Sequence, residues 1–530
     1  MPAALLYAGT ATPTATLTGE CTLQAFAGLG ACPPVLPSVA GFYQNYFAQP
    51  GRPNTGLDAQ LAAQQARGPY RVSVDGDNAI RTRNTVVTDT LTIDIGGGAK
   101  IKNIFGYTDV HYFMATDADG TPYAISQESA EFGHGGMDQT YHAFSEELQL
   151  VGTTLDSNLD YVVGGYYSHE KSPTRFRSGF FGIAFGGLSQ DNIYDITNRT
   201  LAGYGQVTYH FGDTGIAATG GLRYTAERVG KRVLPGDSIR AALGETPPPG
   251  YSYDQHRSFK NVSWTLGLQD QVTDQLLLYV TSRRGYRNGG FNGQSAPFVG
   301  EAVNGGDAYK AERVTDLEGG AKFNGYLAGM PFRISSDVYY NWVVNSQRVA
   351  FALVNGNIAS LTVNVPKGRT YGFELETQFR PIRPLSVGGA FNYTNARFTE
   401  GQVSVLGATQ TFDQVPDTPR YNAQMFADLS LPIGPSFSVL LHGDVYYQSS
   451  SSTSPRSANF AGTHVPGYTL ANFRLGLENE DRGWSLTANL KNAFKKTYYV
   501  GGLQAGEIYQ VNTLIPGEPR TVTVEARVKF

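Results

Sequence analysis

The sequence predicts an all-β protein, a transmembrane antiparallel up-and-down β-barrel. Three observations predict this fold. Segments of nine to eleven residues alternate apolar and polar side chains, short connections alternate with long ones, and the composition suits a wall between lipid and water. Glycine is abundant at 63 residues, aromatic residues reach 12%, and charged residues reach only 16%. The mean hydropathy is −0.26, as expected where lipid-facing and lumen-facing residues cancel in the average.

The last ten residues, TVTVEARVKF, show the strand pattern clearly. Val522, Val524 and Val528 take one face of an extended strand, and Glu525 and Arg527 take the other. The same period of two runs through WSLTANLKNAF (484–494), YNAQMFADLSL (421–431), FRISSDVYYNW (332–342) and YGFELETQF (371–379). About 9–11 tilted residues are enough to cross a bilayer as β-structure, so these segments are predicted to be spanning strands.

The connections supply the second regularity. Eight of them have the length of tight turns and lie at 96–99, 153–158, 212–215, 271–275, 324–331, 381–384, 432–436 and 479–483. The stretches between the turns are longer and rich in Gly, Pro, Asn and Ser, at 113–140, 170–197, 229–256, 289–308, 345–366, 398–419, 449–466 and 499–518. Short connections at one end of the strands and long connections at the other are typical of a barrel with short periplasmic turns and long extracellular loops.

Eight hairpins and the final strand make about seventeen strands. We expect the barrel to span residues 84–530, and residues 1–83 to form an extracellular loop or partial N-terminal region. An odd count that begins outside does not make a complete bacterial barrel, and residues 1–20 lack the basic region and apolar core of a signal peptide. We therefore expect an N-terminal portion to be missing. No window of eighteen uncharged apolar residues suggests a membrane helix.

The charge and the cysteine content bear on the partners of the protein and on its cellular compartment. The net charge is −4 and no basic stripe is visible, which argues against a nucleic-acid partner. Cys21 and Cys32, the two cysteines, favour one loop-closing disulfide in an oxidising compartment; two unpaired thiols are the alternative. One low-complexity run, QSSSSTSPRS (448–457), lies between two strand-like segments.

Enzyme signatures are absent from the sequence. No serine lies in a complete G-x-S-x-G motif, and HEKSP at His169 lacks the second histidine of a zinc motif. The eight histidines show no ligand spacing, and Glu146 and Glu147 point to opposite faces of a strand. We predict no catalytic residue, no metal site and no cofactor.

Seven segments, spread along the predicted barrel, carry a family resemblance when taken together. They are KNIFGYTDV (102–110), FSEELQLVG (144–152), YVTSRRGYRNGGFNG (279–293), VTDLEGGAKF (314–323), GRTYGFELE (368–376), LTANLKNAFKKTYY (486–499) and PGEPRTVTVEARVKF (516–530). Together they resemble segments of TonB-dependent outer-membrane receptors. The resemblance implies a 22-stranded barrel around an N-terminal plug domain, with uptake energised through a short N-terminal box. Neither plug nor box is visible, so the chain resembles the C-terminal barrel portion.

The aromatic end of the chain carries a further implication of that resemblance. Phe530 is similar to the C-terminal signal that the barrel-assembly machinery reads in outer-membrane proteins. The alternative is an ordinary half-buried strand that happens to be last.

Three arginines are candidate ligand contacts in the lumen. Arg283, Arg284 and Arg287 stand close to glycines at the outer end of a strand. Pointing inward, they would form a positive wall suited to anionic ligands or to acidic plug residues. The alternative is salt bridging to lumen carboxylates such as Glu318.

Aromatic residues of the outer region form the second candidate group. Tyr251, Tyr253, Phe291 and Tyr309 belong to it, and Tyr498 and Tyr499 have the same character. They would stack on an aromatic siderophore, a corrin or a sugar, or else belong to the aromatic girdle at the membrane interface.

The function that the resemblance to this family implies is that of an outer-membrane receptor in a Gram-negative cell. It would take up a bulky solute, with an iron–siderophore complex as the leading candidate. The expected partners are outer-membrane lipid, a TonB-type energy-transducing protein acting through the missing N-terminal region, the barrel-assembly machinery and a small ligand such as a ferric siderophore. The rivals are a passive porin-like channel and a barrel enzyme.

Overall fold

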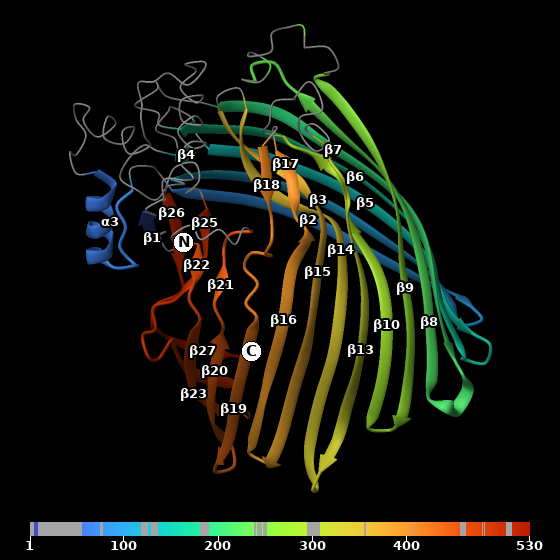
Figure 1. Ribbon diagram of the computed structural model, residues 1–530. Coiled ribbons are helices and arrows are strands. Elements are labelled where there is room, and N and C mark those ends of the chain that lie inside the picture. Colours follow the sequence, from blue (N-terminus) through green and yellow to red (C-terminus); the bar gives the residue numbers. More distant parts are fainter. Residues whose placement is uncertain are drawn as a thin grey trace.

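The computed structural model describes most of the chain. The described residues are 5–8, 56–74, 78–117, 126–128, 136–180, 190–237, 240, 246, 252–293, 308–354, 357–405, 408–455, 463–479, 481, 483–504 and 511–529. Long strands form one coiled sheet in which β2–β8 cross behind β13–β19 (Figure 1). Within these residues, no helix combines the length and the apolar character that a membrane span requires.

Among the described residues, seventeen strands follow one another in this sheet, and each pairs antiparallel with the next. They are β2 (Ala79–Gly96), β3 (Ala99–Asp117), β5 (Gly136–Thr154), β6 (Leu159–Phe180), β7 (Gln190–His210), β8 (Ile216–Val233), β9 (Asp254–Thr273), β10 (Leu276–Arg287), β13 (Glu312–Leu327), β14 (Met330–Val354), β15 (Asn357–Ile382), β16 (Leu385–Glu400), β19 (Tyr421–Ile433), β20 (Phe437–Gln448), β23 (Tyr468–Asn479), β24 (Trp484–Lys491) and β27 (Thr521–Val528). The predicted fold class is confirmed.

All eight tight turns lie where the sequence predicts them, between the strands of eight hairpins. Left-handed backbone supports several of them, as at Gly98, whose φ is 79°, and at Gly434, whose φ is 68°. The last strand also ends on this side, where the Lys529 amide donates to the Gly483 carbonyl at 2.7 Å.

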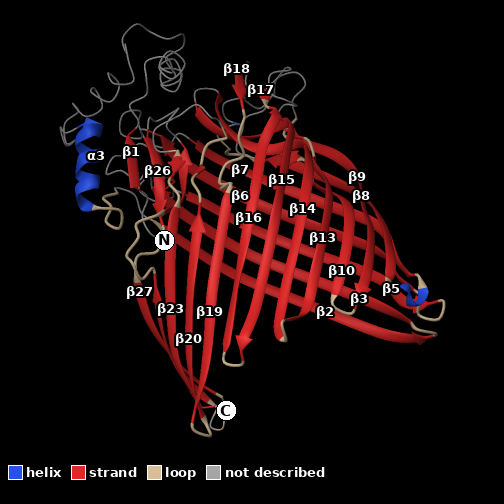
Figure 2. Ribbon diagram, turned by 60° about the horizontal axis from the view of Figure 1, so that its bottom comes forward, coloured by secondary structure: helices blue, strands red, loops and turns tan. Residues whose placement is uncertain are grey.

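The long-loop end holds small additional sheets and a helix (Figure 2). Four pairs are separate from the main sheet: β11 (Gly290–Phe291) with β12 (Ala308–Tyr309), β17 (Gln402–Val405) with β18 (Ala408–Thr411), β21 (Ser451–Ser452) with β22 (His464–Val465), and β25 (Tyr499–Gln504) with β26 (Val511–Pro516). A short strand β4 (Ser126–Glu128) and a helix α3 (Gly56–Arg67) also lie at this end. From residues 1–83, β1 (Leu5–Ala8) adds to the edge of β26.

One predicted long loop is wrong. Residues 345–366 form the outer part of the β14–β15 hairpin, whose register continues without a break from Ser346↔Val365 to Val354↔Asn357. The polar and small residues there suggested a loop, but the two strands pair beyond the membrane level and need no apolar outer face there. The long connections at 170–197 and 398–419 also begin and end with strand.

The two faces of the sheet differ as the period of two predicts. Val524, Leu486 and Met425 lie on the outer face and are exposed, Val524 at 69%. Outer-face rings contact one another from strand to strand at two levels. Near the long-loop end they are Tyr340, Trp342, Tyr371, Phe391, Tyr393 and Tyr421; near the turns they are Phe323, Phe332, Phe379, Phe437 and Trp484. Two aromatic belts mark the two membrane–water interfaces.

The pairings close one circuit, β3–β5–β6–β4, because β4 pairs with both β3 and β6. The row of long strands has two ends, β2 and β27. Within the described residues no ladder joins these two strands, so each presents one unpaired edge.

Candidate ligand-binding site

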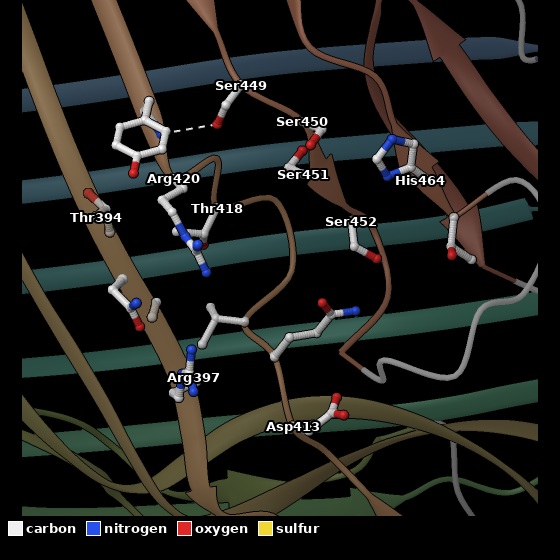
Figure 3. A pocket seen from close by; sticks show the side chains of 16 residues that line it. Thr394, Arg397, Asp413, Thr418, Arg420, Ser449, Ser450, Ser451, Ser452 and His464 are labelled. Carbon is white, nitrogen blue, oxygen red and sulfur yellow. Dashed lines mark hydrogen bonds between the residues drawn. The ribbon is translucent and has the colours of Figure 1, made fainter.

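A polar pocket of about 590 Å³ lies at the long-loop end of β16, β19 and β20. Strand β16 forms one wall, the segment that leads into β19 forms the floor, and the serine segment after β20 forms the opposite wall (Figure 3). The residues that line it are Thr394, Asn395, Ala396, Arg397, Asp413, Gln414, Val415, Thr418, Arg420, Tyr421, Ser449, Ser450, Ser451, Ser452, Thr463 and His464.

Backbone pairing at the strand ends holds these walls together. The Thr394 amide donates to the Arg420 carbonyl at 3.0 Å, which joins β16 to the residue before β19. The Ser449 amide donates to the Tyr421 carbonyl at 2.9 Å, and the Ser449 hydroxyl accepts from the Tyr421 amide at 3.0 Å. An isolated bridge joins Arg397 to Gln414. The pocket is therefore built on strand ends rather than on free loops.

The low-complexity run supplies the hydroxyl groups. Ser449, Ser450, Ser451 and Ser452 follow β20 in sequence and all line the pocket. The Ser452 carbonyl accepts from the Asp417 amide at 2.8 Å, which fixes the serine segment against the floor. The sequence placed this run in a long connection between two strand-like segments, and the structure places its serines in the wall of the pocket.

The charges of the pocket are mainly positive. Arg397 and Arg420 lie on one side in Figure 3, and His464 lies on the other side with the serines. Both arginines are exposed, and neither has an ion-pair partner in the part of the chain that the structure describes. Among the described residues that line it, Asp413 is the one carboxylate.

This donor set suits an anion with several oxygen atoms. A guanidinium presents its N–H groups in a planar fork that matches carboxylates and similar oxyanions, and charge-assisted hydrogen bonds are stronger than neutral ones. Hydroxyl groups can turn to donate to further oxygens. The arrangement can bind and orient such a ligand.

The three arginines that the sequence analysis names as candidate ligand contacts lie outside this pocket, and each contacts another side chain. Arg283 forms ion pairs with Asp316 at 2.8 Å and with Glu318 at 2.5 Å, the arrangement of the salt-bridge alternative. Arg287 pairs with Glu312 at 3.2 Å. The Arg284 guanidinium stacks over the Trp264 ring, 4.8 Å from its centroid. The three side chains therefore do not converge on one site.

The predicted aromatic candidates are also dispersed. Phe291 is buried in a cluster with Val229 and Ala308. Tyr309 lies on β12, where burial raises the pKa of its phenol, and the ring of Tyr253 lies 4.4 Å beneath the Arg240 guanidinium. Tyr251, Cys21, Cys32 and Phe530 lie outside the described residues.

The residues that sequence reasoning missed are Arg397, Arg420 and Asp413. Each lies in the stretch at 398–419 or beside it, where no motif marks them. The serine run was the one available signal. Within the described residues, no cluster of three or more His, Cys, Asp or Glu side chains is positioned to hold a metal ion.

The model of the TonB dependent receptor-like β-barrel family matches residues 37–493. Among solved structures, the chain is similar to the ferric yersiniabactin uptake receptor of Yersinia pestis, with a TM-score of 0.68 at 16% identity, over 88% of this chain and 64% of that one. It is also similar to the ferric-catecholate import receptor of E. coli K12 in its closed form, with a TM-score of 0.64 at 18% identity over 90% and 70% of the two chains. A siderophore receptor of Acinetobacter baumannii gives a TM-score of 0.64 at 16% identity over 86% and 66%.

The chain therefore belongs to the family of TonB-dependent receptor-like β-barrels, which are outer-membrane transporters rather than enzymes. The predicted family and location are confirmed. The chain spans about two thirds of the length of these solved receptors, and 64% of the Yersinia receptor.

Proposed function

We propose that the chain forms the barrel wall and outer mouth of a receptor that takes up a bulky, anionic metal chelate of the ferric-siderophore class. Energy would come from a TonB-type partner that acts through an N-terminal region of the receptor. The observation that carries the proposal is the pocket in which Arg397 and Arg420 face a hydroxyl-rich wall at the long-loop end.

The chemistry of the pocket supports an anion over a neutral solute. Two guanidinium groups without carboxylate partners among the described residues favour a ligand that brings negative charge, since each would otherwise remain uncompensated. The solved receptors to which the chain is similar are named for ferric yersiniabactin and for ferric catecholates. A ferric catecholate is such an oxygen-rich anion.

The first prediction tests this pocket directly. In the full chain, the double substitution Arg397→Ala and Arg420→Ala should weaken binding of an anionic ferric tricatecholate by about tenfold or more, because at least one charge-assisted contact is lost. Binding is measured by quenching of tryptophan fluorescence in detergent micelles. A neutral ferric trihydroxamate serves as the second probe and should respond little.

Arg383→Ala is the matched control, because Arg383 is exposed in the β15–β16 turn at the opposite end. It removes the same side chain and should leave both affinities unchanged. If the control variant lost as much affinity as the double variant, or the double variant lost none, the proposal that this pocket binds the ligand would be wrong.

A further inference from the structure

The apolar outer wall ends at one level on strands β6 to β9. Tyr167, Leu201, Tyr224 and Val262 are exposed on this face, one on each strand. The first charged or basic side chains beyond them on the same face are His169, Arg199, Arg228 and Lys260. The register sets Tyr167 opposite Leu201 on β6 and β7, and Tyr224 opposite Val262 on β8 and β9. The boundary therefore crosses the four strands with a step of one pair between β7 and β8. Such a boundary marks the outer interface of the membrane.

Two arginines are directly opposed at this level. Arg199 of β7 pairs in register with Arg228 of β8, and both are exposed. Cβ atoms of directly opposed strand residues lie about 4.5–5.5 Å apart, and like charges in these positions destabilise the pair. Neither Arg199 nor Arg228 has a carboxylate partner among the described residues.

The cations farther out on the same face have carboxylate neighbours. Lys171 lies 3.4 Å from Asp195, and Arg175 lies 2.7 Å from Asp191. Arg232 is opposite Asp195 in register. Uncompensated positive charge is therefore concentrated at the boundary level, next to the apolar wall, rather than spread over the outer region.

We propose that Arg199 and Arg228, flanked by His169 and Lys260, bind a phosphate group of a phosphorylated lipid in the outer leaflet. The two guanidinium forks match phosphate geometry, and a phosphate between them removes their mutual repulsion. Basic side chains beside an apolar membrane surface recognise anionic headgroups in this way. The site lies on the outer wall and is independent of the pocket that Arg397 and Arg420 line.

The test measures lipid binding by the full chain in micelles of a neutral detergent. Diphosphoryl lipid A is titrated, and bound lipid is counted by native mass spectrometry. The double variant R199Q/R228Q should bind it about tenfold more weakly than the unsubstituted chain, since two charge-assisted contacts are lost. R383Q, a change of the same kind at the opposite end, should bind as the unsubstituted chain does.

Two further measurements distinguish a phosphate group carried by a lipid from free inorganic phosphate. The unsubstituted chain should bind lipid A that lacks both phosphates about as weakly as R199Q/R228Q binds diphosphoryl lipid A. Inorganic phosphate at millimolar concentration should not displace diphosphoryl lipid A from the unsubstituted chain. R199K/R228K keeps the charge and should retain part of the binding if R199Q/R228Q fails to fold. Equal binding of both forms of lipid A, or full displacement by inorganic phosphate, would overturn the proposal.

Discussion

At the scale of single residues, glycine and aromatic side chains form cross-strand pairs on the inner face. Tyr279 lies opposite Gly320, and Tyr339 lies opposite Gly372. The same arrangement joins Tyr204 to Gly164 and Phe426 to Gly388. In each pair the ring lies where a side chain of the glycine would stand. This packing gives a reason for the many glycines and tyrosines of the composition.

Gly320→Ala should destabilise the sheet by about 1–3 kcal/mol, the range for overpacking. A Cβ at this position would lie 2.7 Å from the Tyr279 hydroxyl, which also donates to Glu318 at 2.9 Å. The free energy of unfolding is measured by urea titration of the chain in micelles.

Gly203→Ala is the matched control, because nothing lies within 4 Å of a Cβ at that position. It should be neutral or stabilising by up to about 1 kcal/mol, since alanine has the lower backbone entropy when unfolded. If both variants lose the same stability, the ring over Gly320 is not the cause.

At the scale of elements, the outer β14–β15 hairpin has its own hydrophobic core. Leu361, Val363 and Val365 of β15 are almost fully buried against Phe398 and Phe412. Val403 and Val405 of β17 and Ala350 belong to the same cluster, and Val415 packs against it. The hairpin is therefore a packed element above the membrane, and its core adjoins the pocket through Val415.

Leu361→Ala should cost about 2–5 kcal/mol of local stability, because Leu361 is 1% exposed and the hairpin cannot easily collapse around the cavity. The loss is expected in the outer hairpin and in the β17–β18 pair that shares its core, since none of the cluster residues lies in the lower part of β14. Hydrogen exchange of the amides at 346–365 should accelerate while that of the amides at 332–342 stays slow.

Leu222→Ala removes the same atoms from a leucine that is 60% exposed on the outer wall, and should leave exchange in the hairpin unchanged. Uniform acceleration along both parts of β14 in Leu361→Ala would contradict a separately packed hairpin.

At the scale of the whole molecule, the two edges of the sheet are the main liability. Lipid offers no partner to backbone N–H and C=O groups, so each unpaired group in the hydrocarbon region costs several kcal/mol. Within the described residues β2 pairs only with β3, and β27 pairs only with β24. Exposed edges of this kind invite pairing with further strands.

Amides on the free edges of β2 and β27 should therefore exchange faster than those of β14 and β15, which are paired on both sides. Exchange is followed by mass spectrometry on the full chain in neutral micelles. Protection of both edges equal to that of β14 would mean that another strand covers them under those conditions.

The periodicity of the sequence determined the class of fold, the eight tight turns and the division of each strand into lipid-facing and inner faces. These features depend on residues close to one another in the chain, because side-chain alternation and turn geometry are local properties. The abundance of glycine and tyrosine also indicated a β-barrel. Which glycine lies opposite which tyrosine was visible only in the structure.

The tertiary structure alone decided which distant residues meet. Strand register sets Arg199 against Arg228, and the folded strand ends bring Arg397 and Arg420 to the serine segment. Arg283 and Arg287, chosen because they stand close to glycines at the outer end of a strand, form ion pairs with carboxylates of the next strand, β13. Register depends on the turn that joins two strands and on the faces of both strands together, because a shift of one residue reverses every face. Which two residues are opposed is therefore a property of the paired strands and cannot be read from either segment alone.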